Sequence, residues 1–241
     1  NGSTYYEWPV TWKMVRELQP QVCIFGDKGP EVRWVGNERG VAGDPCWATI
    51  DGDKSLSRVE RNCGVRGGPS WVPAEADFPL RQHPHGWYHH PGAKPATPAE
   101  LVSLYFVSVG RNASMNIGIA PDIRGQLCDD DVASLKGFGE RIQAIFKTNL
   151  AQSATVTASN VRGNSPDYAA GNVVNGRKTG ACWATDDNVL TPELIMDFGK
   201  RTEFSVISLR EHIRLGHRVD DWALDSWQDG AWKEFAAGTC I

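Results

Sequence analysis

The stretch TPAELVSLYFVSVGRNASMNIGIAP (residues 97–121) decides the fold class of this chain. It opens with a Thr-x-x-Glu capping box and a proline at the first helical position, which predict a helix that runs to about Val109. The apolar run 116–120 predicts a buried strand that ends at Pro121. A helix followed directly by a buried strand is typical of an α/β repeat.

The same alternation extends to both sides of this stretch. Upstream, apolar residues of 10–19 share one helical face, Pro20 ends that helix, and 22–25 predict a short buried strand. Downstream, three Asp residues at 129–131 stand at the start of a predicted helix, where they complement the positive end of its dipole. Residues 28–95 are rich in Gly, Pro, Trp and His with little periodicity, and such long irregular stretches are usually functional loops.

Beyond about residue 147 the pattern changes from helical to β-type. Short β-branched segments, separated by Gly, Asn, Asp and Pro, have the spacing of a β-sandwich. These predicted strands are 154–158, 194–198, 204–210 and 222–227. The sequence therefore predicts two domains, residues 1–147 of α/β type and residues 148–241 of all-β type, with a boundary near 147–151.

Composition and charge exclude several classes of protein. The 241 residues include 25 Lys and Arg against 29 Asp and Glu, with no basic run, so a nucleic-acid partner is not expected. No apolar run is long enough to span a bilayer, so a membrane partner is not expected either. Ten Trp beside 25 Gly and 14 Pro indicate loop-rich clefts that suit flat, hydroxylated ligands.

The six cysteines show no Cys-x-x-Cys pair and are too sparse for a disulfide scaffold. We expect most of them to be free thiols, although Cys46 and Cys63 could close a loop of about 17 residues in an oxidising compartment. The chain opens at Asn1 without a targeting signal, so we expect any such signal to lie outside it. The apolar end at Ile241 indicates a sandwich that is cut.

Three stretches resemble one enzyme family: 18–40 (LQPQVCIFGDKGPEVRWVGNERG), 70–90 (SWVPAEADFPLRQHPHGWYHH) and 97–127. They are similar to the second half of the catalytic domain of glycoside hydrolase family 29, the α-L-fucosidases, in the branch that prefers α-1,3/1,4-linked fucose. Residues 148–241 resemble the discoidin-like β-sandwich of carbohydrate-binding module family 32. The resemblance implies an α/β plus all-β chain, with a partial (β/α)8-type barrel followed by an incomplete, galactose-binding-like β-sandwich.

The resemblance implies a retaining mechanism with an Asp nucleophile and a Glu general acid/base. Retention needs two carboxyl groups about 5 to 5.5 Å apart across the scissile bond. The acid/base maps onto Glu38, whereas the nucleophile belongs in a Trp-Phe-Asp-Gly-Ala type segment that these residues do not contain. A barrel needs about 250 residues and about 147 are available, so we expect this chain alone to be inactive.

Glu38 also has a plainer interpretation, because a carboxylate in a Gly-Asn-Glu-Arg-Gly turn is usually a solvated charge, here paired with Arg39. A general acid should instead be buried or lie beside the charge of the nucleophile. Glu75 is the second choice for the acid.

Further residues are candidates for contact with the sugar. The resemblance places Trp87 against the apolar face of fucose, and the alternative is a Trp of the core. Arg33 would bind a sugar hydroxyl or hold a carboxylate, and a purely structural role is the alternative. Glu75 and Asp77 alternate in an extended segment, where they would shape the subsite for the attached sugar or anchor Arg81.

No metal or other cofactor is expected in catalysis, because fucosidases of this type need none. A group of histidines in one loop lacks the partner spacing of zinc sites. They are His83, His85, His89 and His90. In the β domain the resemblance points to a structural calcium loop near Asn175 and Thr179. Trp222 and Trp227 are predicted to belong to the core.

The sequence thus predicts a retaining exo-α-L-fucosidase that hydrolyses terminal α-1,3/1,4-linked fucose from glycans. Its partners would be fucosylated oligosaccharides or glycoconjugates. Two alternatives stay open: a non-catalytic carbohydrate-binding protein that acts through the β-sandwich, and a hydrolase of another deoxysugar. The resemblance favours a secreted or periplasmic location.

Overall fold

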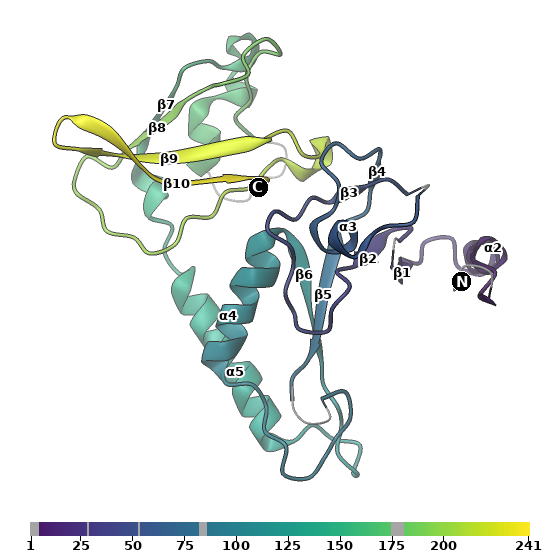
Figure 1. The fold of residues 1–241 in the computed structure, drawn as a ribbon. Coiled ribbons are helices and arrows are strands. Elements are labelled where there is room, and N and C mark those ends of the chain that lie inside the picture. The colour runs from purple at the N-terminus through teal and green to yellow at the C-terminus, as the bar shows by residue number, and fades with distance from the viewer. Residues whose placement is uncertain (1–4, 28, 53, 82–85, 175–180) are drawn as a thin grey trace. The chain divides into compact units, whose positions relative to one another are not determined.

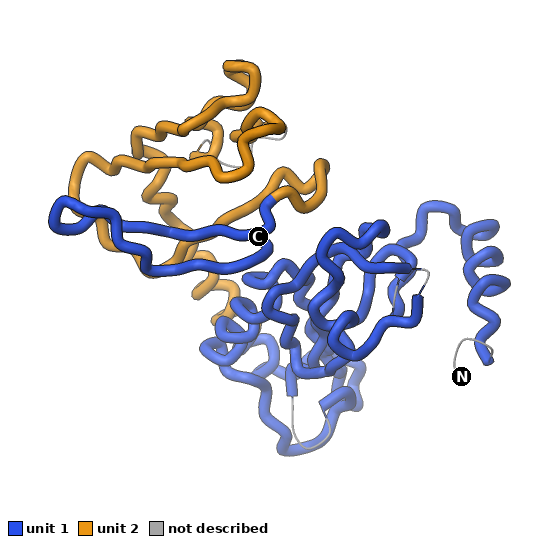
Figure 2. The backbone as a smooth tube through the Cα atoms, turned by 45° about the horizontal axis from the view of Figure 1, so that its top comes forward, with its two compact units in different colours: residues 1–134, 219–241 blue, residues 135–218 orange. Residues whose placement is uncertain are grey.

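The computed structural model describes residues 5–27, 29–52, 54–81, 86–174 and 181–241. They form two compact units, one of residues 1–134 with 219–241 and one of residues 135–218 (Figure 2). These units divide the chain at other points than the predicted boundary near 147–151. The two predicted domains therefore stay a prediction.

The first unit contains a parallel sheet of four strands in the order β1-β2-β5-β6 (Figure 1). The strands are β1 (Phe25–Gly26), β2 (Val32–Trp34), β5 (Ala74–Pro79) and β6 (Ala113–Gly118). β1 overlaps the predicted strand 22–25 at Phe25 alone, and β6 overlaps the predicted strand 116–120 at residues 116–118. The prediction of irregular loops across 28–95 is wrong at β2 and β5, because strands of three and six residues are too short to show a clear period.

Two helices of this unit begin with a capping box. They are α3 (Arg58–Cys63) and α4 (Pro98–Ser108). The predicted box before α4 is confirmed, since the backbone N–H of Thr97 donates to Oε2 of Glu100 at 2.7 Å and the Thr97 side chain accepts from the Glu100 N–H at 3.3 Å. Helix α4 packs beside β6 (Figure 1), and its Leu101 is completely buried.

The described residues also form helices α2 (Trp8–Leu18) and α5 (Asp129–Ile145), and the boundary between the two units at 134/135 falls within α5. Both lie where the sequence predicts them, and α5 starts with the three predicted Asp residues. Helix α2 has no buried residue, so its predicted apolar face does not pack into a core of the described residues. None of the described helices is both long and apolar enough to cross a membrane.

The remaining strands form pairs. In the first unit β3 (Thr49–Ile50) pairs with β4 (Ser70–Trp71), and β9 (Asp221–Gln228) pairs with β10 (Ala231–Thr239). In the second unit β7 (Thr155–Ala158) pairs with β8 (Leu194–Asp197). The predicted strand at 204–210 is wrong, since these residues are not in a strand. Short 3-10 helices lie at Val109–Arg111, Leu150–Ser153, Arg162–Asn164, Pro166–Tyr168, Ala170–Val174 and Ile213–Leu215.

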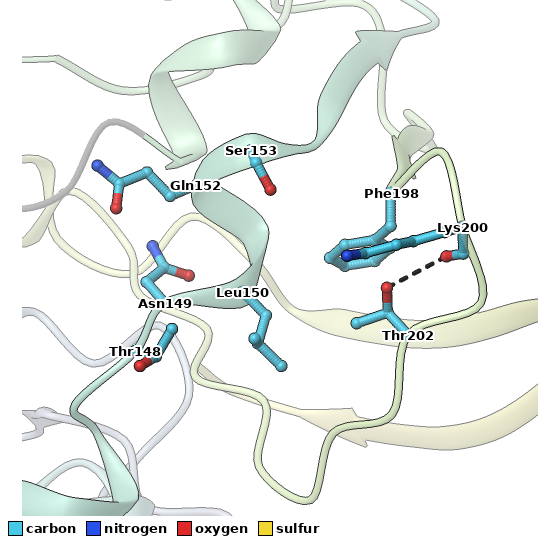
Figure 3. Close-up of a pocket in the computed structure, with 8 residues that line it drawn as sticks. All are labelled: Thr148, Asn149, Leu150, Gln152, Ser153, Phe198, Lys200 and Thr202. Atoms are coloured by element: carbon cyan, nitrogen blue, oxygen red, sulfur yellow. Dashed lines mark hydrogen bonds between the residues drawn. The ribbon is translucent and has the colours of Figure 1, made fainter.

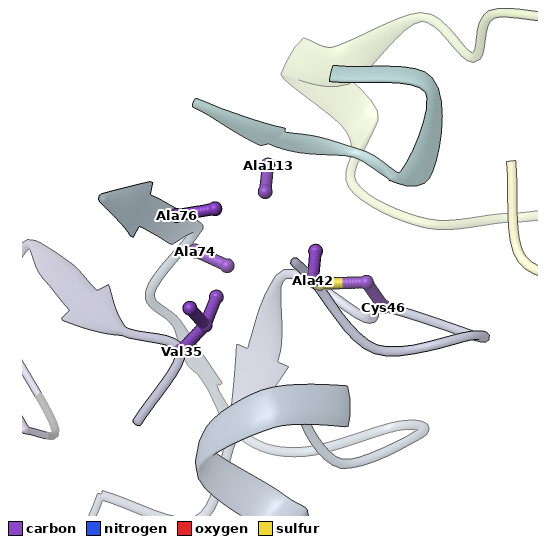
Figure 4. Close-up of a cluster of buried hydrophobic side chains, with 6 residues drawn as sticks. All are labelled: Val35, Ala42, Cys46, Ala74, Ala76 and Ala113. Carbon is purple, nitrogen blue, oxygen red and sulfur yellow. The ribbon is translucent and has the colours of Figure 1, made fainter. Parts of the chain in front are cut away.

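A core of small side chains holds the parallel sheet to the loops beside it (Figure 4). Its members are Val35, Ala42, Cys46, Ala74, Ala76 and Ala113. Alanine at alternate positions of β5 lets the loop after β2 approach the sheet closely. All six cysteines are free, in agreement with the expectation that most of them are thiols.

Candidate active site

The carboxyl ends of parallel strands share one edge of a sheet, and α/β proteins place their sites at that edge. Three features of this chain meet there. Glu38 lies in the loop after β2, Trp87 lies in the segment after β5, and Gly118 ends β6.

Backbone hydrogen bonds hold the loop after β2 against β5. The Val35 N–H donates to the carbonyl of Glu75 at 3.1 Å, and the Gly40 N–H donates to the carbonyl of Asp77 at 3.0 Å. Gly40 has φ of +70°, and a Cβ at this position would lie 2.5 Å from Cδ1 of Phe78. A glycine is therefore required where the loop returns to the strand, with Glu38 just before it.

Trp87 joins the predicted acid to the edge of the sheet. Its Nε1–H donates to Oε2 of Glu38, with an N···O distance of 2.9 Å. The same ring lies on the end of β6, because a Cβ on Gly118 would be 2.4 Å from Cζ3 of Trp87. The partner of Glu38 is thus Trp87, not Arg39.

Both members of this pair are open to solvent. Trp87 is 40% exposed, so it is not the fully buried core residue of the alternative interpretation. Glu38 is exposed as well, and it lacks the burial expected of a general acid within this chain. A ligand could therefore reach the carboxylate and the indole together.

Glu75 and Asp77 lie on the same face of β5, as their alternation predicts, and both are partly exposed. Oε1 of Glu75 accepts from Nδ2 of Asn116 at 2.9 Å, and Oδ1 of Asp77 accepts from Nε1 of Trp34 at 2.6 Å. Neither of these bonds goes to Arg81, which differs from the predicted anchoring. The two carboxylates instead tie β5 to its neighbours β6 and β2.

Arg81 is held from another direction. Its guanidinium pairs with Asp130 at 2.5 Å and with Asp131 at 2.9 Å, and the Asp131 side chain is 1% exposed. Burial disfavours the charged guanidinium, but the hydrogen bonds and charges of these two carboxylates raise the pKa of Arg81 on balance. The first turn of α5 is therefore attached to the segment after β5 by an ion-pair network.

Arg33 has a different role from the predicted sugar contact. The residue is completely buried, and its guanidinium donates to the carbonyls of Arg61 at 3.0 Å and Val72 at 2.7 Å. Its Nη2 lies 3.5 Å from Sγ of Cys46. These contacts with protein groups support the structural alternative for Arg33.

One group of metal-ligand side chains lies together among the described residues, with ligand atoms within 4.8 Å of one another: Cys128, Asp130 and Asp131. Asp130 and Asp131 are both paired with Arg81, so their charges are already compensated within the protein. The donor set does not fit a metal centre without displacing that arginine. His83 and His85 lie outside the described residues.

The second unit contains a cavity of about 350 Å³ between the 3-10 helix at 150–153 and the loop after β8 (Figure 3). Asn149 and Gln152 line one side, and Figure 3 shows Phe198 on the facing loop. The predicted calcium positions Asn175 and Thr179 lie outside the described residues.

Sequence reasoning missed Gly118 as part of the site. A glycine that ends a buried strand is a signal for close approach of another group, and here that group is the Trp87 ring. The glycine alone does not identify Trp87 as the approaching group, because Gly118 and Trp87 lie on different elements.

No protein-family model matches the chain. Two plant proteins match nearly its whole length: one from Oryza sativa subsp. japonica is 35% identical over 98% of this chain, and alpha-L-fucosidase 1 from Arabidopsis thaliana is 33% identical over 96%. The match covers 46% of each plant protein. The chain thus spans about half the length of the curated relatives it matches.

Solved structures give the same result. The crystal structure of SpGH29 superposes with a TM-score of 0.87 and 32% identity, over 98% of this chain and 51% of that one. A Ruminococcus gnavus GH29 fucosidase in complex with fucose gives a TM-score of 0.80 and 31% identity, over 91% of this chain and 45% of that one. The neighbours share its mixed α/β fold. The chain is thus similar in sequence and in fold to proteins named α-L-fucosidases, several of them of glycoside hydrolase family 29.

Proposed function

We propose that this chain carries the acid/base part of a retaining exo-α-L-fucosidase that releases terminal α-1,3/1,4-linked fucose from glycans. The observation that carries the proposal is the 2.9 Å hydrogen bond from Trp87 Nε1 to Glu38 Oε2 at the carboxyl edge of the sheet. A proton donor and an exposed aromatic surface stand together there, as a sugar hydrolase requires. The names of the relatives point to the same substrate class.

In the proposed mechanism an Asp nucleophile attacks the anomeric carbon while Glu38 protonates the glycosidic oxygen, so that the attached sugar leaves and a fucosyl-enzyme forms. Glu38 then takes a proton from the water that attacks the fucosyl-enzyme, which returns the anomeric carbon to its original configuration. Trp87 packs on the apolar face of fucose and orients the Glu38 carboxyl through its indole N–H. Glu75 and Asp77 shape the subsite of the attached sugar from the exposed face of β5.

The nucleophile of this proposal is an Asp in a Trp-Phe-Asp-Gly-Ala type segment, which the 241 residues do not contain. The parallel sheet would then be part of a (β/α)8-type barrel, and strands β7 to β10 part of a discoidin-like sandwich. The chemistry needs two carboxyl groups and no cofactor. A structural calcium near Asn175 and Thr179 belongs to the same proposal.

The test compares kcat/KM of the Glu38→Ala variant on substrates with good and poor leaving groups. The variant is made in a longer polypeptide that joins these residues to a nucleophile segment. Proton donation contributes about 10²- to 10⁴-fold, so kcat/KM on a Lewis trisaccharide should fall by that factor. With 2,4-dinitrophenyl fucoside it should fall far less, because that leaving group departs without protonation.

The matched control is Glu75→Gln, which should affect both substrates alike. A leaving-group dependence in the Glu75 variant instead of the Glu38 variant would reverse the assignment. The 241-residue chain by itself should show no turnover. A 2-fluoro-fucosyl adduct on an Asp within 1–147 would contradict the absence of a nucleophile.

A second candidate is a non-catalytic carbohydrate-binding protein, and the cavity of the second unit favours it. Amide side chains and the ring of Phe198 line this cavity, and such groups suit the hydroxyls and the apolar face of a sugar. Under this alternative Phe198→Ala abolishes glycan binding, whereas Glu38→Ala leaves every measured property unchanged.

A further inference from the structure

A second cavity lies beside Glu38 in the first unit. It has a volume of about 250 Å³, is open to solvent, and is bordered by the loop after β2 and by helix α3. Asn37 and Arg39, the two neighbours of Glu38 in the chain, both line it. Arg58 and Asn62 line it from α3. The cavity therefore shares its wall with the loop that carries the proposed proton donor.

Arg39 and Arg58 are both exposed, and no hydrogen bond or ion pair of their guanidinium groups is found among the residues that the structure describes. The nearest acids in the chain are engaged elsewhere. Glu38, next to Arg39, accepts from Trp87. Glu60, close to Arg58, accepts from the backbone N–H of Ser57 at 2.8 Å in the capping box of α3. Two guanidinium groups are thus left without a compensating charge.

The amide side chains of the cavity are used to build its walls. Nδ2 of Asn62 donates to the carbonyls of Val35 at 3.1 Å and Val41 at 3.2 Å, which fixes α3 to the loop. Nδ2 of Asn37 donates to the same Val41 carbonyl at 2.9 Å. The guanidinium groups of Arg39 and Arg58 are therefore the polar groups of the cavity lining that remain available to bind a ligand.

A third arginine adds to the positive charge at this place. Gly36 lines the cavity, and a Cβ at this position would lie 3.7 Å from Nε of Arg61. The Arg61 guanidinium is therefore close to the part of the cavity wall that Gly36 forms. Its Nη1 pairs with Asp27 at 3.3 Å, whereas its buried Nε has no hydrogen-bond partner within the described ranges of the chain. Asp27 thus compensates Arg61, whereas Arg39 and Arg58 form no ion pair with any residue in the described part of the chain.

We propose that this cavity binds an anionic group, a carboxylate or a sulfate, on the sugar to which fucose is attached. Planar guanidinium forks match the geometry of both anions. The volume is below the roughly 300–1,000 Å³ of pockets that enclose a whole drug-sized ligand, so it suits one charged group of a larger glycan. The proposal rests on the proposed function, because the role of Glu38 is what makes the neighbouring cavity an aglycone subsite.

The test is calorimetric titration of the 241-residue chain at low salt with galactose 3-sulfate, galacturonic acid and galactose. Both anionic sugars should bind, and galactose should bind at least about tenfold more weakly. The relative affinity of the first two distinguishes a sulfated from a carboxylated glycan. Arg39→Ala and Arg58→Ala should each weaken the anionic sugars by about tenfold. The matched control is Arg124→Ala, because this exposed arginine is already paired with Asp122.

Equal binding of galactose and its sulfate would overturn the proposal, and so would anion affinities that neither arginine variant changes. Amide NMR shifts in the unsubstituted chain keep the test valid if a variant fails to fold. Addition of galactose 3-sulfate should shift signals of residues 36–41 and 58–63, and shifts confined to other residues would contradict it. No fucose is involved, so a negative result here leaves the leaving-group test of Glu38 untouched.

Discussion

At the scale of single residues, burial decides the chemistry of Cys46. The side chain is 2% exposed, and this burial raises the pKa of its thiol, although the guanidinium of Arg33 at 3.5 Å opposes the shift. The thiol is therefore neutral in the folded protein over a wider pH range than an ordinary cysteine. Cys23, by contrast, is exposed to solvent.

We expect iodoacetamide at pH 8 to alkylate Cys23 quickly and Cys46 slowly in the folded protein, because the thiolate is the reactive form. Because the folded-state pKa of Cys46 is raised, its contribution to stability is present below the ordinary value of 9.0 and is lost as pH rises beyond it. Timed alkylation with peptide mass spectrometry measures the rates. Denatured protein is the control, and equal native rates at the two cysteines would contradict the account.

At the scale of elements, glycine positions bring the loops of the site together. The Trp87 ring occupies the space that a side chain on Gly118 would need, at the end of β6. Gly40 serves the same purpose against Phe78 of β5. The Glu38–Trp87 bond thus depends on backbone positions in other elements.

Gly118→Ala should push the Trp87 ring away and break its hydrogen bond to Glu38. The expected result is a shift of the Trp87 indole N–H signal in NMR and a loss of about 1–3 kcal/mol in the free energy of unfolding. Gly139→Ala is the control, since nothing lies within 4 Å of that position in α5 and alanine favours helices. An unchanged indole signal in the Gly118 variant would show that the ring does not depend on this glycine.

The elements that sequence could predict are those with local signals. The capping box at Thr97 and the three Asp residues of α5 act within one helical turn, so α4 and α5 were predictable from spacing. β2 and β5 lack such signals. The same holds for the site, because the pairing of Glu38 with Trp87 joins two loops and no local pattern contains it. The resemblance to the fucosidases, rather than periodicity, pointed to both residues.

At the scale of the whole molecule, the predicted β-sandwich is not established by the described strands. β7 and β8 pair in one unit, and β9 and β10 pair in the other. The prediction that Trp222 and Trp227 both belong to a core is wrong for Trp227, which is 60% exposed. Their separation along β9 is odd, so alternation places them on opposite faces. Trp222 donates its indole N–H to the carbonyl of Cys240 at 3.0 Å.

The length of the chain bears on the proposed mechanism. The chain spans about half of its curated relatives, and it supplies an exposed Glu38 with an aromatic neighbour but no segment of the nucleophile type. The length of the chain, its parallel sheet and the exposed Glu38 are consistent with a chain that supplies one of the two carboxyl groups of the proposed retaining mechanism.

The central claim is that Glu38 is the acid/base, and the product that azide forms with Glu38→Ala tests it most directly. The measurement uses the longer polypeptide that carries the nucleophile, with NMR to identify the anomer of fucosyl azide. Because the nucleophile remains, azide attacks the fucosyl-enzyme after one inversion, and the account predicts restored turnover with the retained α anomer. Fucosyl azide of inverted β configuration would show that Glu38 is the nucleophile, and the absence of any rescue would contradict its role in proton transfer.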